Sequence, residues 1–238
     1  MYINLKEAII LAGGLSLRLK PHTWTDKPLL KFGDKTLLEM QIDWLFKKGF
    51  EHVVIATTPS ISDKINLNHE YLDKMSLSLE YNKLGTGGAI FRAMDWISSK
   101  KVYIMNVDDL LLNFNPMLLF QEHKKGGIVC LHKPKIGYGL ARLRNGMIIR
   151  FQEKPTIKYW VSCGHYVFDR KTIADYFPIK GDFEPNVLPI LAKERLLYGY
   201  KYHGEWITVN TYKENLEALE KLKYIKWTRR GVEGKRNV

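Results

Sequence analysis

The feature that most constrains this chain is a repeated alternation of short apolar runs with segments of helical periodicity up to residue 125. The apolar runs are continuous, as expected for strands buried on both faces. They are EAIILA (7–12), HVVIAT (52–57), LSLEYN (77–82) and VYIMNV (102–107), and the helical segments between them cover 36–49, 87–99 and 116–125. Strands that alternate with helices pair in parallel through crossover connections, so the sequence predicts an α/β, Rossmann-like fold.

The pattern of predicted strands and helices changes after residue 126. Short strands are predicted at 127–132, 139–143, 147–152 and 160–168, with turns at Gly137, Gly139 and Asn145-Gly146. We expect them to make an antiparallel or mixed addition to the same, mainly parallel sheet. Helices are predicted at 182–194, interrupted by Pro189, and at 211–227. The sequence thus predicts one domain over 1–238, with a first half (7–125), a second half (126–226) and a basic tail (227–238).

Composition narrows the class of protein. Of the 238 residues, 45% are hydrophobic, which is typical of a globular chain. Cys130 and Cys163 lie in apolar runs without CxxC spacing, so we expect buried free thiols in a reducing cytoplasm. No run approaches the roughly 18 apolar residues of a membrane span, and the first residues do not resemble a signal peptide.

The formal net charge of +12 leaves three interpretations open: a nucleic-acid surface, an anionic small substrate or a lysine-rich surface. The densest basic run is the end of the chain, KWTRRGVEGKRNV. No named RNA- or DNA-binding motif is present, which disfavours nucleic acid as a partner.

A glycine pair follows the first predicted strand, in LAGGLSLRLKPHTWTDKP (11–28). In open parallel sheets ligands bind at the carboxyl ends of the strands, and successive N–H groups of a glycine-rich turn can hold an anion. The pattern is neither GxGxxG nor GxxxxGK[ST]. Taken alone, the stretch therefore fits a tight turn as well as a phosphate-binding loop.

Six segments in order resolve this ambiguity through a family resemblance. Residues 11–39 resemble the LAGGxGxRLxPxTxxxPKP signature of the sugar-phosphate nucleotidylyltransferases. The other segments that resemble the family are LGTGGAI (84–90), NVDD (106–109), FQEKP (151–155) with VSCGHYVF (161–168), DFEPNVLPILAKERLLYGY (182–200) and WITVNT (206–211). Together they extend over nearly all of residues 7–218, as in a short form of the family without a C-terminal β-helix. The resemblance implies that the half 7–125 binds the nucleotide and that the half 126–226 binds the sugar phosphate.

The resemblance implies transfer of a nucleotidyl group from a nucleoside triphosphate to a sugar 1-phosphate, with release of pyrophosphate. It implies catalytic roles for Arg18 at the β- and γ-phosphates, Lys27 at the α-phosphate and Asp108 as a ligand of Mg²⁺. It also implies nucleotide binding by Leu11, Ala12, Gly13, Gly14, Leu84, Gly85 and Thr86, and sugar-phosphate binding by Glu153, Lys154, Gly164 and Glu184.

Several positions depart from the family pattern. Ser16 stands for a glycine, and a positive φ there would cost about 1 kcal/mol. Asp26 stands for a proline and Val107 for a glycine. Thr208 stands where the family has its second metal-binding aspartate, and Asn210 is the residue that could compensate as a metal ligand.

These departures leave a second function open, a catalytically weakened relative that binds a nucleotide or sugar nucleotide and regulates a partner. GTP or UTP is favoured as the triphosphate, and the sugar is not fixed. A monomer and a homodimer are both compatible with the length. The helix 212–226, with Leu216, Leu219, Leu222 and Ile225, is expected to pack on its own domain, with an intersubunit contact as the alternative.

Overall fold

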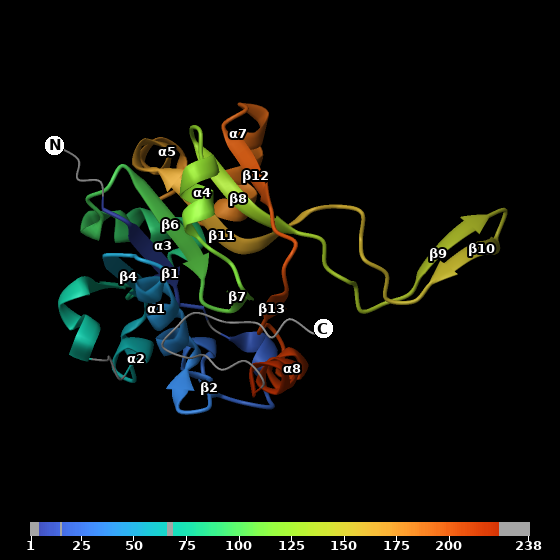
Figure 1. Ribbon diagram of the computed structural model, residues 1–238, viewed down its shortest axis with the longest axis horizontal. Coiled ribbons are helices and arrows are strands. Elements are labelled where there is room, and N and C mark those ends of the chain that lie inside the picture. Colours follow the sequence, from blue (N-terminus) through green and yellow to red (C-terminus); the bar gives the residue numbers. More distant parts are fainter. Residues whose placement is uncertain (1–4, 15, 66–68, 224–238) are drawn as a thin grey trace, which may run out of the picture.

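A seven-stranded mixed sheet forms the centre of the computed structural model, which describes residues 5–14, 16–65 and 69–223 (Figure 1). The sheet confirms the predicted α/β class, because four of its six strand pairs are parallel and only β11 runs against its two neighbours. The strands in spatial order are β12 (Leu197–Lys201), β8 (Gly127–His132), β11 (Val161–Asp169), β6 (Lys101–Asn106), β1 (Glu7–Leu11), β4 (His52–Thr57) and β5 (Met75–Leu79).

Helices cover both faces of this sheet, which explains why the strands read as continuous apolar runs. Ala8 and Ile10 of β1 pack into one core with α1 (Leu37–Lys47), α4 (Met117–Glu122) and α8 (Tyr212–Lys223). Ile9 points to the other face, where the core is completed by α3 (Gly85–Ala93), α5 (Arg170–Tyr176), α6 (Phe183–Asn186) and α7 (Leu188–Lys193). Successive strand residues therefore enter opposite cores.

The first long helix begins and ends where the sequence predicts. Thr36 caps α1 in a reciprocal arrangement with Glu39, each side chain accepting a hydrogen bond from the other's backbone N–H. The helix stops at Lys47, and Gly49 follows with a φ of 88°, a conformation that glycine adopts without a Cβ penalty.

Short elements surround the carboxyl edge of the sheet. β7 (Asp109–Leu111) pairs antiparallel with β13 (Trp206–Thr208), and β2 (Lys31–Phe32) pairs with β3 (Lys35–Thr36). Five further helices are short, and of these η3 and η4 precede β5 and β6 rather than follow a strand: α2 (Pro59–Ser62), η1 (Leu17–Leu19), η2 (Lys27–Leu29), η3 (His69–Lys74) and η4 (Met94–Trp96). Among the described residues, no helix has the length and apolar character needed to cross a membrane.

One expectation from the sequence is wrong. The strands β9 (Leu140–Arg144) and β10 (Met147–Gln152) do not join the main sheet but pair only with each other. We call residues 137–153 the arm, because in Figure 1 they project away from the rest of the molecule. The predicted turn is confirmed, since Asn145 and Gly146 have φ angles of 48° and 80°, as in the tight turns of two-residue hairpins.

Other expectations are confirmed in outline. Cys130 and Cys163 are buried free thiols, and the helix predicted at 182–194 is broken into α6 and α7 at Val187. Leu219 and Leu222 of α8 pack on the core of their own domain, as expected, whereas Leu216 is exposed. Ile225 and the basic tail 227–238 lie outside the described residues. The sequence did not predict β12, β13 or β7.

Candidate active site

The predicted site residues at the ends of β1 and β6 lie side by side because these strands are parallel neighbours in register. Leu11 pairs with Asn106, so Ala12, Gly13 and Gly14 leave the sheet beside Val107 and Asp108. Gln41, which is buried in α1, donates hydrogen bonds to the backbone carbonyls of Val107 and Asp109, at 3.2 and 2.9 Å. The segment after β6 is thus fixed by the packed helix below it.

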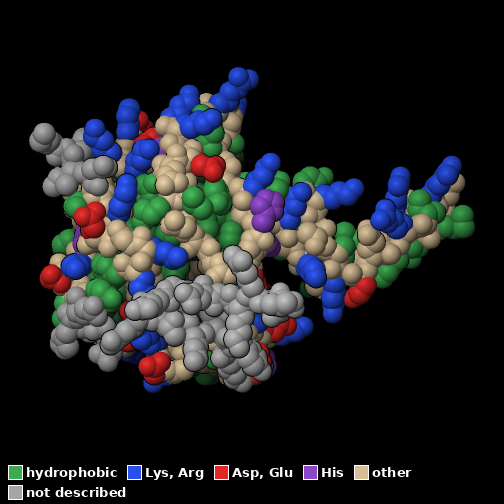
Figure 2. All heavy atoms as spheres, viewed as in Figure 1, with side chains coloured by type: hydrophobic (Ala, Val, Ile, Leu, Met, Phe, Trp, Pro, Cys, Tyr) green, Lys and Arg blue, Asp and Glu red, His purple; other side chains and the backbone are tan. Residues whose placement is uncertain are grey.

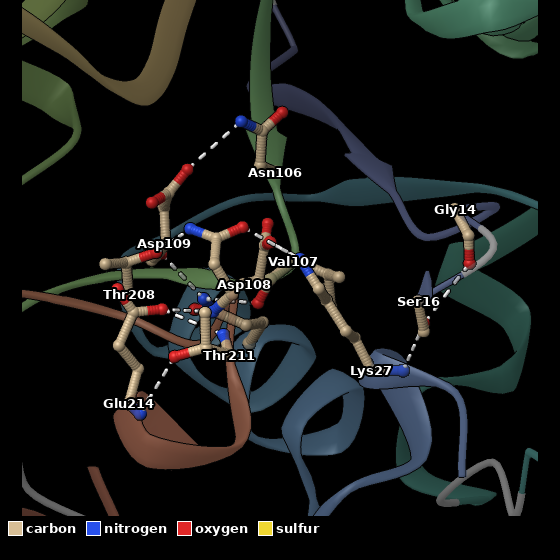
Figure 3. A network of polar contacts seen from close by, with 12 residues as sticks. Gly14, Ser16, Lys27, Asn106, Val107, Asp108, Asp109, Thr208, Thr211 and Glu214 are labelled. Carbon is tan, nitrogen blue, oxygen red and sulfur yellow. Dashed lines mark hydrogen bonds and ion pairs between the residues drawn. The ribbon is translucent and has the colours of Figure 1, made fainter. Parts of the chain in front are cut away.

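A lysine, a carboxylate and an amide from three distant parts of the chain meet at this edge (Figure 3). Lys27 Nζ lies 2.5 Å from Asp108 Oδ2 and donates to Asn210 Oδ1 at 2.9 Å. The side chains of Lys27 and Asp108 are only 13% and 17% exposed, so water screens the pair weakly. The structure therefore brings together three residues that the resemblance singled out.

Asn210 is held by the start of α8. Its backbone N–H, like that of Thr211, donates to Glu214 Oε2, and the N–H of Glu214 donates to Thr211 Oγ1. This is a capping box, which fixes where the helix begins. The amide nitrogen of Asn210 donates to Thr208 Oγ1, so the amide oxygen points toward Lys27 Nζ and Thr208 serves as the hydrogen-bond acceptor behind it.

Ser16 adopts the left-handed conformation that the family pattern predicted, with a φ of 53°. Its hydroxyl accepts a hydrogen bond from the backbone N–H of Lys27 at 2.8 Å and donates to the carbonyl of Gly14 at 3.4 Å. The side chain is buried. These hydrogen bonds offset the free-energy cost of the left-handed backbone at Ser16. They also connect the glycine loop to the start of η2 and so position Lys27.

Arg18 lies in η1, on the same loop, and is exposed to solvent. Within the described part of the chain, no hydrogen bond or ion pair engages its guanidinium. Gly14 is likewise exposed. The loop therefore presents a free cation and exposed backbone beside the Lys27 cluster.

Asp109 is a buried carboxylate that the sequence did not single out. It accepts hydrogen bonds from Trp206 Nε1 at 2.8 Å and Asn106 Nδ2 at 3.0 Å. Burial and the neighbouring Asp108 raise the pKa of Asp109 to about 7. Gly164, which has a φ of 76°, leaves space for it, because a Cβ there would lie 1.9 Å from Asp109 Oδ2. The only sequence signal was the adjacent pair of aspartates.

Residues from both predicted halves form a second cluster around the start of α3. Thr86 Oγ1 donates to Glu184 Oε2 at 2.5 Å, and the backbone N–H of Thr86 donates to Asp182 Oδ1 at 2.9 Å. Burial raises the pKa of Glu184 above its ordinary value. Leu84 and Gly85 therefore stand beside a predicted sugar-binding carboxylate.

Glu80 joins this second cluster to the glycine loop, and the sequence did not single it out either. It accepts a hydrogen bond from the backbone N–H of Leu84 at 3.2 Å. A Cβ at Gly13 would lie 2.9 Å from Glu80 Oε1, so the carboxylate touches the loop directly. Burial raises the pKa of Glu80.

Glu153 and Lys154 are not brought to these clusters. They lie at the root of the arm, where both side chains are exposed and Lys154 has a φ of 44°. Among the described residues, neither side chain forms a hydrogen bond or ion pair with the rest of the molecule. Their predicted role at the sugar phosphate stays a prediction.

The oxygens of Asp108 and Asn210 can hold a cation, because both already point at the ammonium of Lys27. The described residues contain no cluster of three His, Cys, Asp or Glu side chains that could hold a metal ion. One carboxylate and one amide oxygen suit Mg²⁺ when phosphate oxygens and water supply its remaining ligands. The donor set therefore fits Mg²⁺ bound together with a nucleotide.

Several known proteins are similar to this chain in sequence or in fold. A family model described as nucleotidyl transferase matches residues 7–222. A mannose-1-phosphate guanylyltransferase catalytic subunit beta from Danio rerio is 29% identical over 228 residues, which are 90% of this chain and 63% of the relative. The chain thus spans about 63% of the length of such curated relatives.

Solved structures share the fold. HddC from Yersinia pseudotuberculosis aligns with a TM-score of 0.73 at 21% identity, covering 93% of this chain and 100% of that one. A second structure of HddC, complexed with GMP-PN, aligns with a TM-score of 0.71 at the same identity and coverage.

Proposed function

Because the chain belongs to the nucleotidyl transferase family, we propose that it transfers a nucleotidyl group from a nucleoside triphosphate to a sugar 1-phosphate, giving a sugar nucleotide and pyrophosphate. The observation that carries the proposal is the meeting of Lys27, Asp108 and Asn210 beside the glycine loop at the carboxyl edge of the sheet. Ligands bind at that edge in open α/β folds.

The reaction joins a phosphate oxygen of the sugar 1-phosphate to the α-phosphorus and breaks the bond from that phosphorus to the β-phosphate bridging oxygen. It requires charge neutralisation and in-line positioning more than covalent help. When the triphosphate binds, the ammonium of Lys27 leaves the carboxylate of Asp108 and contacts the α-phosphate oxygens. The guanidinium of Arg18 binds the departing pyrophosphate. Bound Mg²⁺ supplies Lewis-acid stabilisation of the phosphate charge, and Asp108 and Asn210 would hold it.

GTP is the triphosphate that we favour over UTP. The relatives include mannose-1-phosphate guanylyltransferases, and a neighbour in fold was solved with GMP-PN. Glu80 gives a physical reason, because a carboxylate beside the glycine loop can accept hydrogen bonds from both N1–H and N2–H of guanine. Uracil offers only one such donor, so Glu80 would discriminate between the two bases. We place the reaction in the cytoplasm.

The sugar 1-phosphate would bind between Gly164, Glu184 and the root of the arm. Mannose 1-phosphate is the first substrate to test, since it is the substrate named in the guanylyltransferase relatives. Lys154 carries an exposed ammonium suited to the sugar's phosphate, and Glu153 an exposed carboxylate suited to its hydroxyls.

A panel of triphosphates and sugar 1-phosphates, with pyrophosphate release as readout, tests the activity. Calorimetry on Arg18→Ala then tests the assignment of the site. We expect about a 30-fold loss of affinity for GTP, as for one charge-assisted contact, and little change for GDP-mannose, which lacks the leaving phosphates. Lys20→Ala removes another exposed cation close by and serves as the matched control. Equal losses for GTP and GDP-mannose would contradict the role of Arg18.

A second function is favoured by one observation, the neutral Thr208 in place of the second family aspartate. In that alternative the chain binds a nucleotide or sugar nucleotide and regulates a partner. Its signature is nucleotide binding without pyrophosphate release under any combination of substrates.

A further inference from the structure

A histidine that the proposed reaction does not use is buried behind the carboxyl edge of the sheet. Lysine and arginine side chains gather on the surface of the body and the arm (Figure 2), whereas His165 of β11 is only 1% exposed. Its Nε2 lies 3.0 Å from the backbone carbonyl oxygen of Asp109. Its Nδ1 lies 2.5 Å from the hydroxyl oxygen of Tyr103, which is also buried. The ring therefore joins strand β6 to the turn that follows it.

The two partners of the ring determine which nitrogen carries the proton. Burial lowers the pKa of His165 to about 4, so near pH 7 the ring is neutral, with one donor and one acceptor nitrogen. A carbonyl oxygen only accepts, so Nε2–H donates to Asp109 and Nδ1 accepts from Tyr103. Burial raises the pKa of Tyr103 well above its ordinary value, so the hydroxyl keeps its proton and donates.

Aromatic neighbours hold the ring from the side. The rings of Trp44 and Phe114 meet it at 76° and 68°, each with a centroid distance of 6.1 Å. In the antiparallel pair of β11 and β6, His165 lies opposite Met105. The diagonal neighbour Tyr103 is then within reach on the same face. Packing and hydrogen bonding thus both aim Nε2–H at the carbonyl of Asp109.

That carbonyl belongs to a turn in which three successive backbone oxygens are held. Gln41 of α1 donates to the carbonyl of Asp109 at 2.9 Å and to that of Val107 at 3.2 Å. Between them, the carbonyl of Asp108 accepts from the backbone N–H of Val209 at 3.0 Å. The peptide groups on both sides of Asp108 therefore have fixed orientations, and these determine where its carboxylate points (Figure 3).

We propose that His165 is a positioning residue for Asp108, because its Nε2–H and the amide of Gln41 together hold the Asp109 carbonyl. Since Gln41 also holds Val107, a shift of the Asp109 carbonyl is passed to the peptide group before Asp108. The proposal rests on the proposed function, in which Asp108 holds Mg²⁺. Thr208 stands in place of a second carboxylate, so the direction of Asp108 matters all the more.

Two substitutions of His165 separate the hydrogen bond from the packing of the ring. The amide of His165→Gln reaches the place of Nε2 and can donate to Asp109. The amide of His165→Asn is one methylene shorter, so it can contact Tyr103 but not Asp109. We expect His165→Asn to lower the affinity for GTP with Mg²⁺ about 10-fold, as for loss of an outer partner of a metal ligand. His165→Gln should stay within about threefold of the wild type.

Calorimetry of the full chain with GTP, with and without Mg²⁺, measures these affinities. Without the metal, we expect both variants to bind GTP within about twofold of the wild type. A residue that only fills space would affect both variants alike, because both remove the ring. Equal losses of Mg²⁺-dependent affinity in the two variants, no loss in His165→Asn, or a loss that is the same without Mg²⁺ would overturn the proposal.

Tyr103→Phe removes one hydroxyl with little change of shape, and it decides the question if the histidine variants do not fold. We expect it to lower the Mg²⁺-dependent affinity about threefold, a smaller effect because Asp109 keeps its donor. Tyr202→Phe is the matched control, since the hydroxyl of Tyr202 is also buried but lies against the carbonyls of Leu112 and Glu205. Equal effects of the two substitutions would overturn the proposal.

Nitrogen-15 NMR of the ring gives a readout that needs neither metal nor nucleotide. The His165 signals are assigned by their absence from the spectrum of His165→Gln. We expect the proton on Nε2 in the wild type, and a shift of the Nδ1 signal in Tyr103→Phe but not in Tyr202→Phe. A proton on Nδ1 would overturn the proposal. The expected tautomer in a chain that binds no GTP would contradict the proposed function instead.

Discussion

The carboxyl edge of the sheet and the arm both carry residues predicted to bind substrate, but they are positioned in different ways. At the edge, Lys27, Asp108 and Asn210 come from three distant segments of the chain, and each is held by hydrogen bonds of 2.9 Å or less. At the root of the arm, Glu153 and Lys154 are exposed, and among the described residues their side chains form no hydrogen bond or ion pair.

This difference suggests that the two regions determine different kinetic parameters. Groups that stabilise charge in a transition state are effective when they are already oriented, because no reorganisation is needed at the moment of reaction. Residues on a ribbon that the body does not hold are oriented only when something binds them. We therefore expect changes at the edge to act on kcat and changes at the root of the arm to act on KM.

The largest expected effect is that of Asp108→Asn. The substitution keeps the shape of the side chain but removes the carboxylate charge on which the metal depends, and Thr208 offers no second carboxylate. We expect kcat to fall at least 1,000-fold, or about 4 kcal/mol. Steady-state pyrophosphate release measures it. Asp26→Asn is the control, since Asp26 precedes Lys27 in the chain but forms no ion pair with it within the described residues. A tenfold loss or less for Asp108→Asn would remove Asp108 from the catalytic set.

Two glycines, one at the sheet edge and one on the arm, allow the packing of these regions to be compared by substitution. Gly164 and Gly146 have similar φ angles, 76° and 80°. A Cβ at Gly164 would collide with Asp109, whereas a Cβ at Gly146 would meet nothing within 4 Å. We expect Gly146→Ala to cost about 1 kcal/mol of unfolding free energy from backbone strain alone. Gly164→Ala should cost about 3 kcal/mol or more, because overpacking is added. Urea unfolding measures both, and equal costs would show that the edge is not closely packed.

The sequence predicts the centre of the fold well because its signals there are local. Continuous apolar runs identify β1, β4 and β6, and apolar residues at helical spacing over 36–49 identify α1. The positive φ of Ser16 also follows from its place in the glycine loop. The family pattern assigned Lys27 and Asp108 to one active site, and the structure shows that the two side chains form an ion pair.

The failures concern partners that are distant in the chain. Short apolar runs bounded by turn residues predict β9 and β10 as strands, but they do not say which strand each pairs with, and here the two pair only with each other. The role of Asp109 depends on Trp206 and Gly164, which only the folded chain places around it. The sequence shows two adjacent aspartates and no sign of which one is buried.

Lys154→Ala tests the arm. If Lys154 holds the sugar's phosphate, its loss removes one charge-assisted contact, and the KM for the sugar 1-phosphate should rise about 30-fold, or roughly 2 kcal/mol. The affinity for GTP should remain within twofold, as measured by calorimetry. Lys158→Ala removes an exposed lysine in the segment that leads from the root of the arm to β11, and it should change neither value. Loss of GTP affinity in Lys154→Ala would show that the two phosphate sites are assigned the wrong way round.

The smallest effect is expected at Thr208, where the edge itself departs from the family. Thr208→Asp restores an anionic oxygen two residues from Asn210, with little change in side-chain size. A second carboxylate should strengthen the hold on Mg²⁺, and bound metal relieves the repulsion between the two anions. We expect the Mg²⁺ concentration for half-maximal activity to fall about 5-fold, or roughly 1 kcal/mol. A Mg²⁺ titration of pyrophosphate release measures this shift, with Thr208→Asn, which adds no charge, as the control. If wild type and Thr208→Asp both bind GTP but release no pyrophosphate with any sugar 1-phosphate, the edge is a nucleotide-binding site without catalysis. The regulatory alternative then replaces the enzymatic one.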